Sequence, residues 1–298
     1  MEDRRYVLLE ERGALAVRGA EARSFLQGLI SNDIERASAS RAIYATLLTP
    51  QGKFLHDFFV VALDGALVID CEAGRRADLE RRLNFYRLRA KVEIAAADDY
   101  AVAALIGEGA ADALGLDAAE GSARAFAGGV AYVDPRLAAA GARALLPRAG
   151  AEDALETAGF APARFEDYDR LRLALGLPDG SRDLPVEKAF LLENGIDDLN
   201  GIDFGKGCYV GQELTARTKN RGVIRKRLFR VDVDGPLPAP GTPLMLGEAK
   251  AGVMRSGREG AGLALLRLEM VEKAAESGEA LTAGDARLSP VKPEWAMF

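Results

Sequence analysis

The strongest restriction on the fold of this chain is a pair of apolar runs, residues 58–63 and 66–69, separated by the dipeptide Asp64-Gly65. Both runs are rich in β-branched and aromatic residues, which favour strands. An Asp-Gly pair suits a two-residue type I′ turn, because both central positions of that turn need a positive φ. The sequence therefore predicts an antiparallel β-hairpin at these residues.

Helical patterns lie on both sides of the hairpin. Between residues 19 and 32, apolar residues recur at intervals of three and four, which is typical of one face of an amphipathic helix. A strand is expected at residues 14–17, and a basic helix at about 73–90. A strand, a helix, a hairpin and a second helix in this order predict an α+β fold built on an antiparallel sheet.

The segment from about 98 to 160 repeats this theme with different residues. Strand and helix patterns alternate in it, with a hairpin expected around Gly128-Gly129. The order of elements is that of a ferredoxin-like split βαβ unit. A further helix is expected from Phe165 to Leu175, where Gly176 and Pro178 end it.

The hydrophobic pattern changes near residue 222. Beyond it, apolar and charged residues alternate with a period of two, which is typical of strands, and a stretch rich in Pro and Gly follows. The sequence therefore predicts three domains. Residues 1–97 and 161–221 form one α+β domain, residues 98–160 a second α+β domain, and residues 222–298 an all-β domain.

Composition and charge limit the class of protein. The 298 residues are 49% hydrophobic with a net charge of −6, so the chain can bury a core and has no bulk attraction for nucleic acid or anionic membranes. It contains no apolar run long enough for a membrane span, and its first residues do not resemble a secretory signal. We therefore expect a cytoplasmic protein with neither a stable nucleic-acid partner nor a membrane partner.

The chain has few residues that bind transition metals. Cys71, Cys208 and His56 are the only cysteines and the only histidine, and three such residues cannot complete a four-ligand zinc or iron–sulfur site. No permanently bound metal is expected, and any role with a metal needs ligands from a partner. Cys71 ends an apolar run and is expected to be a buried structural thiol.

Cys208 lies in a stretch rich in glycine, which leaves the backbone free to turn and to let a ligand approach. Lys206 and Arg217 can place positive charge near its sulfur, which would lower the pKa of the thiol. Gln212 and Glu213 add an amide and a carboxylate able to orient a neighbour or accept a proton. From these residues alone, a reactive thiol and a small buried apolar residue both stay open.

A basic segment follows this cysteine. Seven of the fourteen residues from Arg217 to Arg230 are Lys or Arg, and none is acidic. Such a segment can bind an anion or an acidic protein partner. The alternative is a solvated connector between two domains.

His56 and Asp57 stand next to each other before the hairpin. Neighbouring side chains of a strand point to opposite faces of its sheet, so we do not expect these two to form a catalytic pair. One of them is expected to face solvent. The chain has no nucleophile-elbow, P-loop or dinucleotide fingerprint.

The residues KGCYVGQE, from Lys206 to Glu213, match the signature of the YgfZ family of folate-binding proteins. The sequence resembles the mitochondrial-type branch of that family, which acts in iron–sulfur cluster assembly. Residues 19–33 and 169–178 are similar to segments of the glycine-cleavage T-protein superfamily of aminomethyltransferases. The resemblance implies a T-protein-like fold, with ferredoxin-like α+β domains around a central cavity and a C-terminal β-barrel.

The same resemblance implies a cofactor, partners and a function. Tetrahydrofolate would bind in the central cavity, and the partners would be iron–sulfur apo-proteins or other assembly factors. The function would be assembly or repair of [4Fe–4S] proteins, including tRNA-modifying radical enzymes. Cys208 would be a transient cluster ligand or a nucleophile. The functional residues that the signature implies are Lys206, Cys208, Tyr209, Gln212 and Glu213, followed by Arg217.

Two further residues carry the folate expectation. Tyr168 stands where bacterial members have a tryptophan that contacts folate, and Asp57 falls where T-proteins hold their catalytic aspartate. Gly13 and Ala174 replace two other folate-contacting residues of these relatives. Two alternatives to an assembly factor stay open: a folate-dependent one-carbon transferase that uses Asp57, and a scaffold that docks through residues 217–230.

Overall fold

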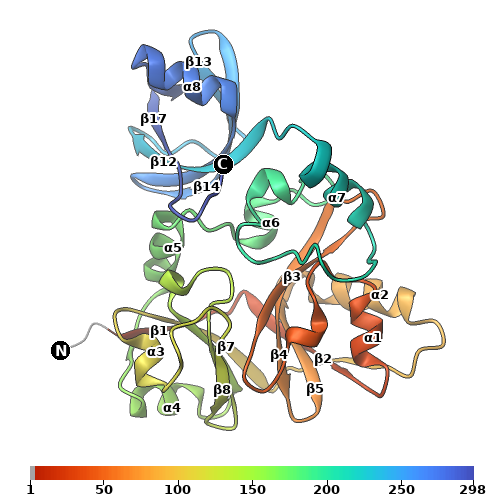
Figure 1. Ribbon diagram of the computed structural model, residues 1–298. Coiled ribbons are helices and arrows are strands. Elements are labelled where there is room, and N and C mark those ends of the chain that lie inside the picture. Colours follow the sequence, from red (N-terminus) through yellow and green to blue (C-terminus); the bar gives the residue numbers. More distant parts are fainter. Residues whose placement is uncertain (1–3) are drawn as a thin grey trace.

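The chain folds into two helix-covered β-sheets and a closed β-barrel (Figure 1). The computed structural model describes residues 4–298. The acidic start of the chain, residues 1–3, on which the secretory-signal prediction partly rests, lies outside the described residues. Within the described part, no helix is both long and apolar enough to cross a membrane.

The first sheet has five antiparallel strands and contains the predicted hairpin. Asp64 and Gly65 both have positive φ, at 50° and 73°, which confirms the expected turn. The predicted helices are shorter than their apolar patterns. The elements are β2 (Arg12–Arg18), α1 (Ala22–Gln27), η1 (Ile34–Arg36), β3 (Ile43–Leu48), β4 (Phe54–Leu63), β5 (Ala66–Glu72), η2 (Ala73–Arg75), α2 (Arg76–Arg87) and β6 (Glu93–Ala96).

The second sheet has six strands, and two of them, β1 and β11, lie outside the predicted domain of residues 98–160. Its strand β1 comes from the start of the chain, because β1 pairs with β7 and β11 and not with the first sheet. Its hairpin turns at Ala127-Gly128, one residue before the predicted pair. The elements are β1 (Arg5–Leu8), β7 (Tyr100–Ile106), α3 (Ala110–Ala113), β8 (Ala123–Phe126), β9 (Gly129–Val133), η3 (Ala138–Ala140), β10 (Ala142–Pro147), α4 (Ala151–Thr157) and β11 (Ala161–Pro162).

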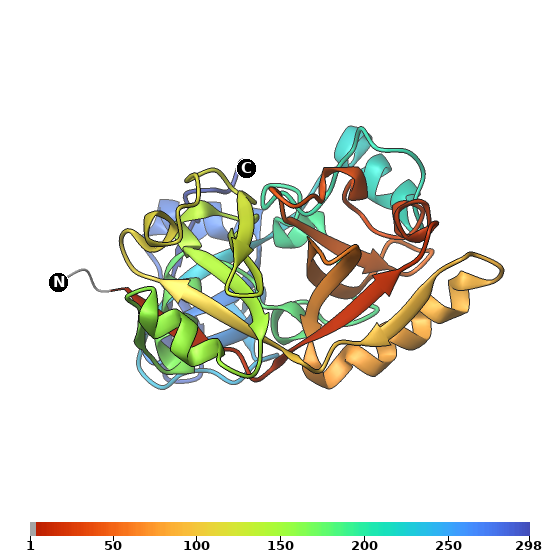
Figure 2. The same ribbon diagram turned by 90° about the horizontal axis from the view of Figure 1, so that it is seen from below.

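The two sheets pack face to face, and helices cover their outer faces (Figures 1 and 2). Both faces of β4 are therefore buried. His56 points to the helix side, where its Nε2 lies 2.9 Å from Asp78 Oδ2, and Asp57 points between the sheets. The expectation that one of these residues faces solvent is wrong, because their exposed fractions are 2% and 3%.

The remaining residues form a connecting segment and the barrel. The barrel closes through the pairing of β12 with both β15 and β17. The elements of the connecting segment are α5 (Phe165–Ala174), α6 (Gly180–Asp183), η4 (Leu192–Asn194) and α7 (Gln212–Arg221). Those of the barrel are β12 (Lys226–Asp234), β13 (Pro243–Leu246), β14 (Ala249–Arg258), β15 (Ala261–Arg267), α8 (Leu268–Ser277), β16 (Leu281–Ala283) and β17 (Ala286–Val291).

A buried arginine fastens the connecting segment to the barrel. Arg172 of α5 donates hydrogen bonds to Asp169 and Asp183, at 2.6 and 3.0 Å, and to Ser256 of β14 at 2.8 Å. Ser256 N–H in turn donates to Asp183. Because a buried charge is tolerated only when it is paired and hydrogen-bonded, this network fixes the barrel against α5 and α6.

Candidate functional site at the Cys208 loop

Cys208 is exposed, in a loop that the rest of the chain holds on both sides. Before the cysteine, Asp203 N–H donates to Ser31 O at 3.0 Å, and the Asp203 carboxylate accepts from Gly205 and Lys206 N–H. After it, Val210 N–H donates to Gly28 O at 3.1 Å. The loop backbone is therefore fixed while the thiol stands in solvent.

Lys206 anchors this loop from beneath. Its ammonium group donates to the carbonyls of Ile30 and Asn32, at 2.7 and 2.8 Å. Burial lowers the pKa of Lys206 to about 8, and the nearby carboxylates of Asp33 and Asp203 oppose that shift. The ammonium group that was expected to act on the thiol is thus already engaged with two backbone acceptors.

The residues after Cys208 begin helix α7. Tyr209 is buried in the core between the sheets, and burial raises its pKa to about 12. Gln212 accepts a hydrogen bond from Tyr209 N–H at 3.2 Å, so its amide closes the turn. Glu213 and Arg217 form an exposed ion pair one helical turn apart. These four predicted folate contacts therefore have structural partners within the chain, and their role toward folate stays a prediction.

Two glycines of the loop differ in what they allow. Gly211 has a φ of 84°, and a Cβ there would lie 2.5 Å from Thr49 O, so the packing of this loop requires glycine. Gly207 has an ordinary φ, and a Cβ there would meet no atom within 4 Å. The fold does not require glycine at position 207, and its absent side chain leaves the approach to Cys208 open.

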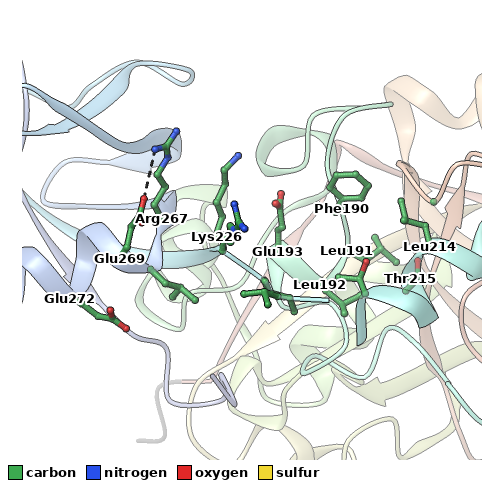
Figure 3. A pocket seen from close by; sticks show the side chains of 16 residues that line it. Phe190, Leu191, Leu192, Glu193, Leu214, Thr215, Lys226, Arg267, Glu269 and Glu272 are labelled. Atoms are coloured by element: carbon green, nitrogen blue, oxygen red, sulfur yellow. Dashed lines mark ion pairs between the residues drawn. The ribbon is translucent and has the colours of Figure 1, made fainter. Parts of the chain in front are cut away.

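A pocket of about 740 Å³ lies on the other side of α7, between this helix and the barrel. Phe190, Leu191 and Leu214 gather at one end of it, whereas Lys226 and the ion pair of Arg267 with Glu269 stand at the other (Figure 3). Apolar side chains with a few charged groups are typical of ligand pockets. Sequence reasoning missed this pocket, because its walls come from segments far apart in the chain.

The basic segment 217–230 is largely neutralised by neighbouring groups. Arg217, Lys219 and Arg230 pair with acidic side chains, and Arg227 donates to Leu192 O while facing Asp197. Among the described residues, no side-chain partner is found for the three remaining cations. These are Arg221, Arg225 and Lys226, and the last two line the pocket.

The centre of the molecule holds the other predicted residues, Asp57 and Tyr168. Tyr44 O–H donates to Asp57 Oδ2 at 2.9 Å, whereas the buried Oδ1 has no hydrogen-bond partner among residues 4–298. Burial raises the pKa of Asp57 to about 6, although Arg12 opposes this shift. Tyr168 is buried, with its hydroxyl 3.5 Å from Arg136 and 3.4 Å from Arg143.

Three arginines fill the space around these two residues. The guanidinium groups of Arg12, Arg136 and Arg143 lie 5.6, 5.0 and 4.1 Å from the centre of the Phe59 ring. Asp70 accepts from Arg12 at 2.7 Å and from Arg143 at 2.8 Å. The sequence signal for this cluster was the presence of charged residues inside strands that otherwise read as apolar.

This central packing does not fit a pterin. Arg136 lies between Tyr44, which holds Asp57, and Tyr168, at 5.6 Å from the centre of the Tyr44 ring. Neither Asp57 nor Tyr168 lines any of five pockets of about 300 to 740 Å³. The unpaired Oδ1 of Asp57 suits a hydrogen bond from a ligand. Tyr168, however, is buried and leaves no exposed ring face on which a pterin could stack.

The structure separates the predicted site residues into two places. Cys208 and its signature neighbours lie on a surface loop, whereas Asp57 and Tyr168 lie between the sheets. Cys71 is buried in the first sheet, as expected, and burial raises the pKa of its thiol to about 12. Within residues 4–298, no three His, Cys, Asp or Glu side chains are grouped closely enough to hold a metal ion.

Known proteins are similar to this chain in sequence. Residues 225–298 match the family described as CAF17, C-terminal beta-barrel domain. The chain is 37% identical to the Homo sapiens protein named iron-sulfur cluster assembly factor IBA57, mitochondrial, over 89% of this chain and 78% of that protein. The Mus musculus protein of the same name is 34% identical over the same shares.

A solved structure shares the whole architecture. The glycine cleavage system aminomethyltransferase T from Bartonella henselae superposes with a TM-score of 0.76 at 18% identity, and covers 98% of this chain and 85% of that one. This likeness confirms the predicted α+β T-protein-like fold and its C-terminal barrel. The predicted cytoplasmic location is wrong, since the Homo sapiens and Mus musculus relatives are named as mitochondrial proteins.

Proposed function

Because this chain belongs to the family of the IBA57 iron–sulfur cluster assembly factors, we propose that it assists the assembly of iron–sulfur proteins through the thiol of Cys208. The observation that carries this proposal is the contrast between an exposed thiol and its fixed backbone. A thiolate that is held in place in solvent can meet the metal site of a partner at little entropic cost.

The chemistry of this thiol is limited by the small number of other ligands. When Cys208 binds iron, its proton leaves to solvent and the thiolate sulfur supplies one ligand. No group of three metal-binding side chains occurs in the described part of the chain. The partner, an iron–sulfur apo-protein or another assembly factor, must therefore provide the remaining ligands.

The finer parts of this function rest on the sequence resemblance. We extend the proposal to [4Fe–4S] proteins, including tRNA-modifying radical enzymes, on the KGCYVGQE signature from Lys206 to Glu213. Membership of the YgfZ family, to which that signature points, has the same basis. The printed names of the relatives support iron–sulfur assembly in general.

Tetrahydrofolate enters the proposal only as a ligand to be tested. The resemblance implies it, but the hydroxyl of Tyr168, the residue expected to contact its pterin, already lies 3.5 Å from Arg136 and 3.4 Å from Arg143. No step of the proposed function therefore passes through folate. The transferase alternative keeps one supporting observation, which is that the buried Oδ1 of Asp57 has no hydrogen-bond partner among the described residues. A titration with tetrahydrofolate would test it.

The scaffold alternative has a narrower basis than the sequence suggested. Most of the basic segment is already paired, which leaves three cations for an acidic partner. These are Arg221 and the two that line the pocket of Figure 3, Arg225 and Lys226. Docking there and action at Cys208 are compatible, because Cys208 is not among the residues that line the pocket.

Complementation tests the proposal. In cells depleted of their own assembly factor, the full chain should restore the activity of [4Fe–4S] enzymes, and Cys208→Ser should not. Cys71→Ala is the matched control, because it removes the buried thiol and should leave the activity restored. Full activity with Cys208→Ser, at equal amounts of protein, would overturn the role of the thiol.

A further inference from the structure

The turn after helix α2 carries an apolar and basic surface that the proposed function does not use. We call residues 85–91 the α2 tip. Phe85 and Leu88 are 75% and 87% exposed, among the most exposed large apolar side chains of the described chain. Figure 2 shows this end of α2 and the turn after it projecting at the outer edge of the first sheet.

The backbone of the α2 tip places a leucine where glycine is usual. Leu88 has φ 46° and ψ −107°, at the first central position of a β-turn that Ala90 N–H closes on Arg87 O at 2.8 Å. These angles are close to those of a type II′ turn, whose first central residue is normally glycine. A bulky residue there is strained, and its side chain gains no burial in return.

The turn is nevertheless held in place. Lys91 N–H donates to Glu21 Oε2 at 2.6 Å, and Val92 N–H donates to Ala90 O at 2.9 Å. The ring of Phe85 makes an edge contact with Tyr86, with centres 5.4 Å apart. Tyr86 itself packs against the core of the first sheet. The apolar surface is therefore presented by a fixed support.

Positive charge surrounds the two apolar side chains. Residues 81 to 92 include five cations and no acidic residue. Arg81 and Arg82 pair with Asp78 at the base of this stretch. The other three cations are exposed, and no side-chain partner is found for them among the described residues. They are Arg87, Arg89 and Lys91.

We propose that the α2 tip binds the surface of an anionic lipid bilayer. Phe85 and Leu88 enter the boundary between headgroups and acyl chains, and Arg87, Arg89 and Lys91 contact the lipid phosphates. Exposed Phe and Leu side chains flanked by Lys and Arg are the composition of interfacial membrane anchors. The inference is independent of the role of Cys208.

The shape of the α2 tip favours a bilayer over a protein partner. Its two apolar side chains stand on a projecting turn, so a protein would need a matching acidic cleft, whereas a bilayer accepts a convex wedge without one. The net charge of −6 does not oppose this binding, because charges further than about 8 Å from the surface are screened at physiological salt.

Vesicle sedimentation with the full chain tests the proposal. The protein should sediment with vesicles of phosphatidylcholine and phosphatidylserine, much less with vesicles of phosphatidylcholine alone, and the bound fraction should fall as salt rises. Leu88→Gly should weaken binding by about tenfold or more, the factor that burial of one leucine side chain is worth. It should also raise the melting temperature, because it relieves the turn.

Matched variants keep the result interpretable. Arg89→Glu combined with Lys91→Glu should abolish the preference for anionic vesicles. Met297→Ser removes an apolar side chain that is 84% exposed elsewhere, and should bind as the wild type does. Absence of binding to anionic vesicles, or binding that Leu88→Gly and the charge reversals leave unchanged, would overturn the proposal. A third result would also overturn it: the wild type captures an acidic protein but does not bind vesicles, and these variants lose that capture.

Discussion

The centre of the molecule and the Cys208 loop hold their polar groups in opposite ways. In the centre, Asp70 is shared by Arg12 and Arg143, and all three side chains are buried. On the loop, Lys206 fastens the backbone while Cys208 stands exposed. A T-protein-like fold can thus fill its middle with paired charges and present an exposed thiol on a loop at the surface.

The largest expected effect is in the centre. Asp70→Asn should lower the free energy of unfolding by about 3–5 kcal/mol, because it leaves Arg12 and Arg143 buried without a charged partner. Urea unfolding followed by circular dichroism measures the loss. A change below about 1 kcal/mol would mean that the guanidinium groups reach solvent, and would contradict the filled centre.

Asp57→Asn should have the opposite sign. Burial raises the pKa of Asp57 from an ordinary 3.8 to about 6, so the folded state favours the protonated carboxyl. The stability that the protonated carboxyl contributes to the folded state is fully present below about pH 4 and is lost as the pH rises through about 6. Asn should therefore raise the free energy of unfolding by up to about 3 kcal/mol at pH 7 and by almost nothing at pH 4. Urea unfolding at both pH values checks this, and equal effects at the two would contradict it.

The smallest expected effect on stability is at the loop. Gly207→Val should change the free energy of unfolding by less than about 0.5 kcal/mol, because a side chain there meets no neighbour. It should still reduce the restored [4Fe–4S] enzyme activity several-fold, since the new side chain stands beside the thiol. Gly74→Val is the control, as that glycine also has open space around it. Equal activity of the two variants would show that the approach to Cys208 does not matter.

Much of the fold could be predicted from local patterns. Asp64-Gly65 gave the hairpin through its backbone preference, and the change of period near residue 222 located the barrel, which starts with β12 at Lys226. The place of β1 could not be predicted, because its pairing with β7 joins residues about one hundred positions apart. Local periodicity contains no record of such a contact.

The candidate site was predicted in part for the same reason. The signature and the scarcity of other ligands pointed to Cys208, and the structure leaves it exposed. The burial of both His56 and Asp57 was missed, because it depends on a second sheet that covers the inner face of β4. The role of Lys206 as an anchor also depends on a distant segment, the carbonyls after α1.

The most direct test of the account compares Cys208→Ser with Asp57→Asn in one complementation assay. Both variants are expected to fold, and equal protein amounts and melting curves would establish that. We expect that Cys208→Ser fails to restore [4Fe–4S] enzyme activity and that Asp57→Asn restores it. The reverse result, with activity lost through Asp57→Asn and kept in Cys208→Ser, would place the function in the centre and contradict the account.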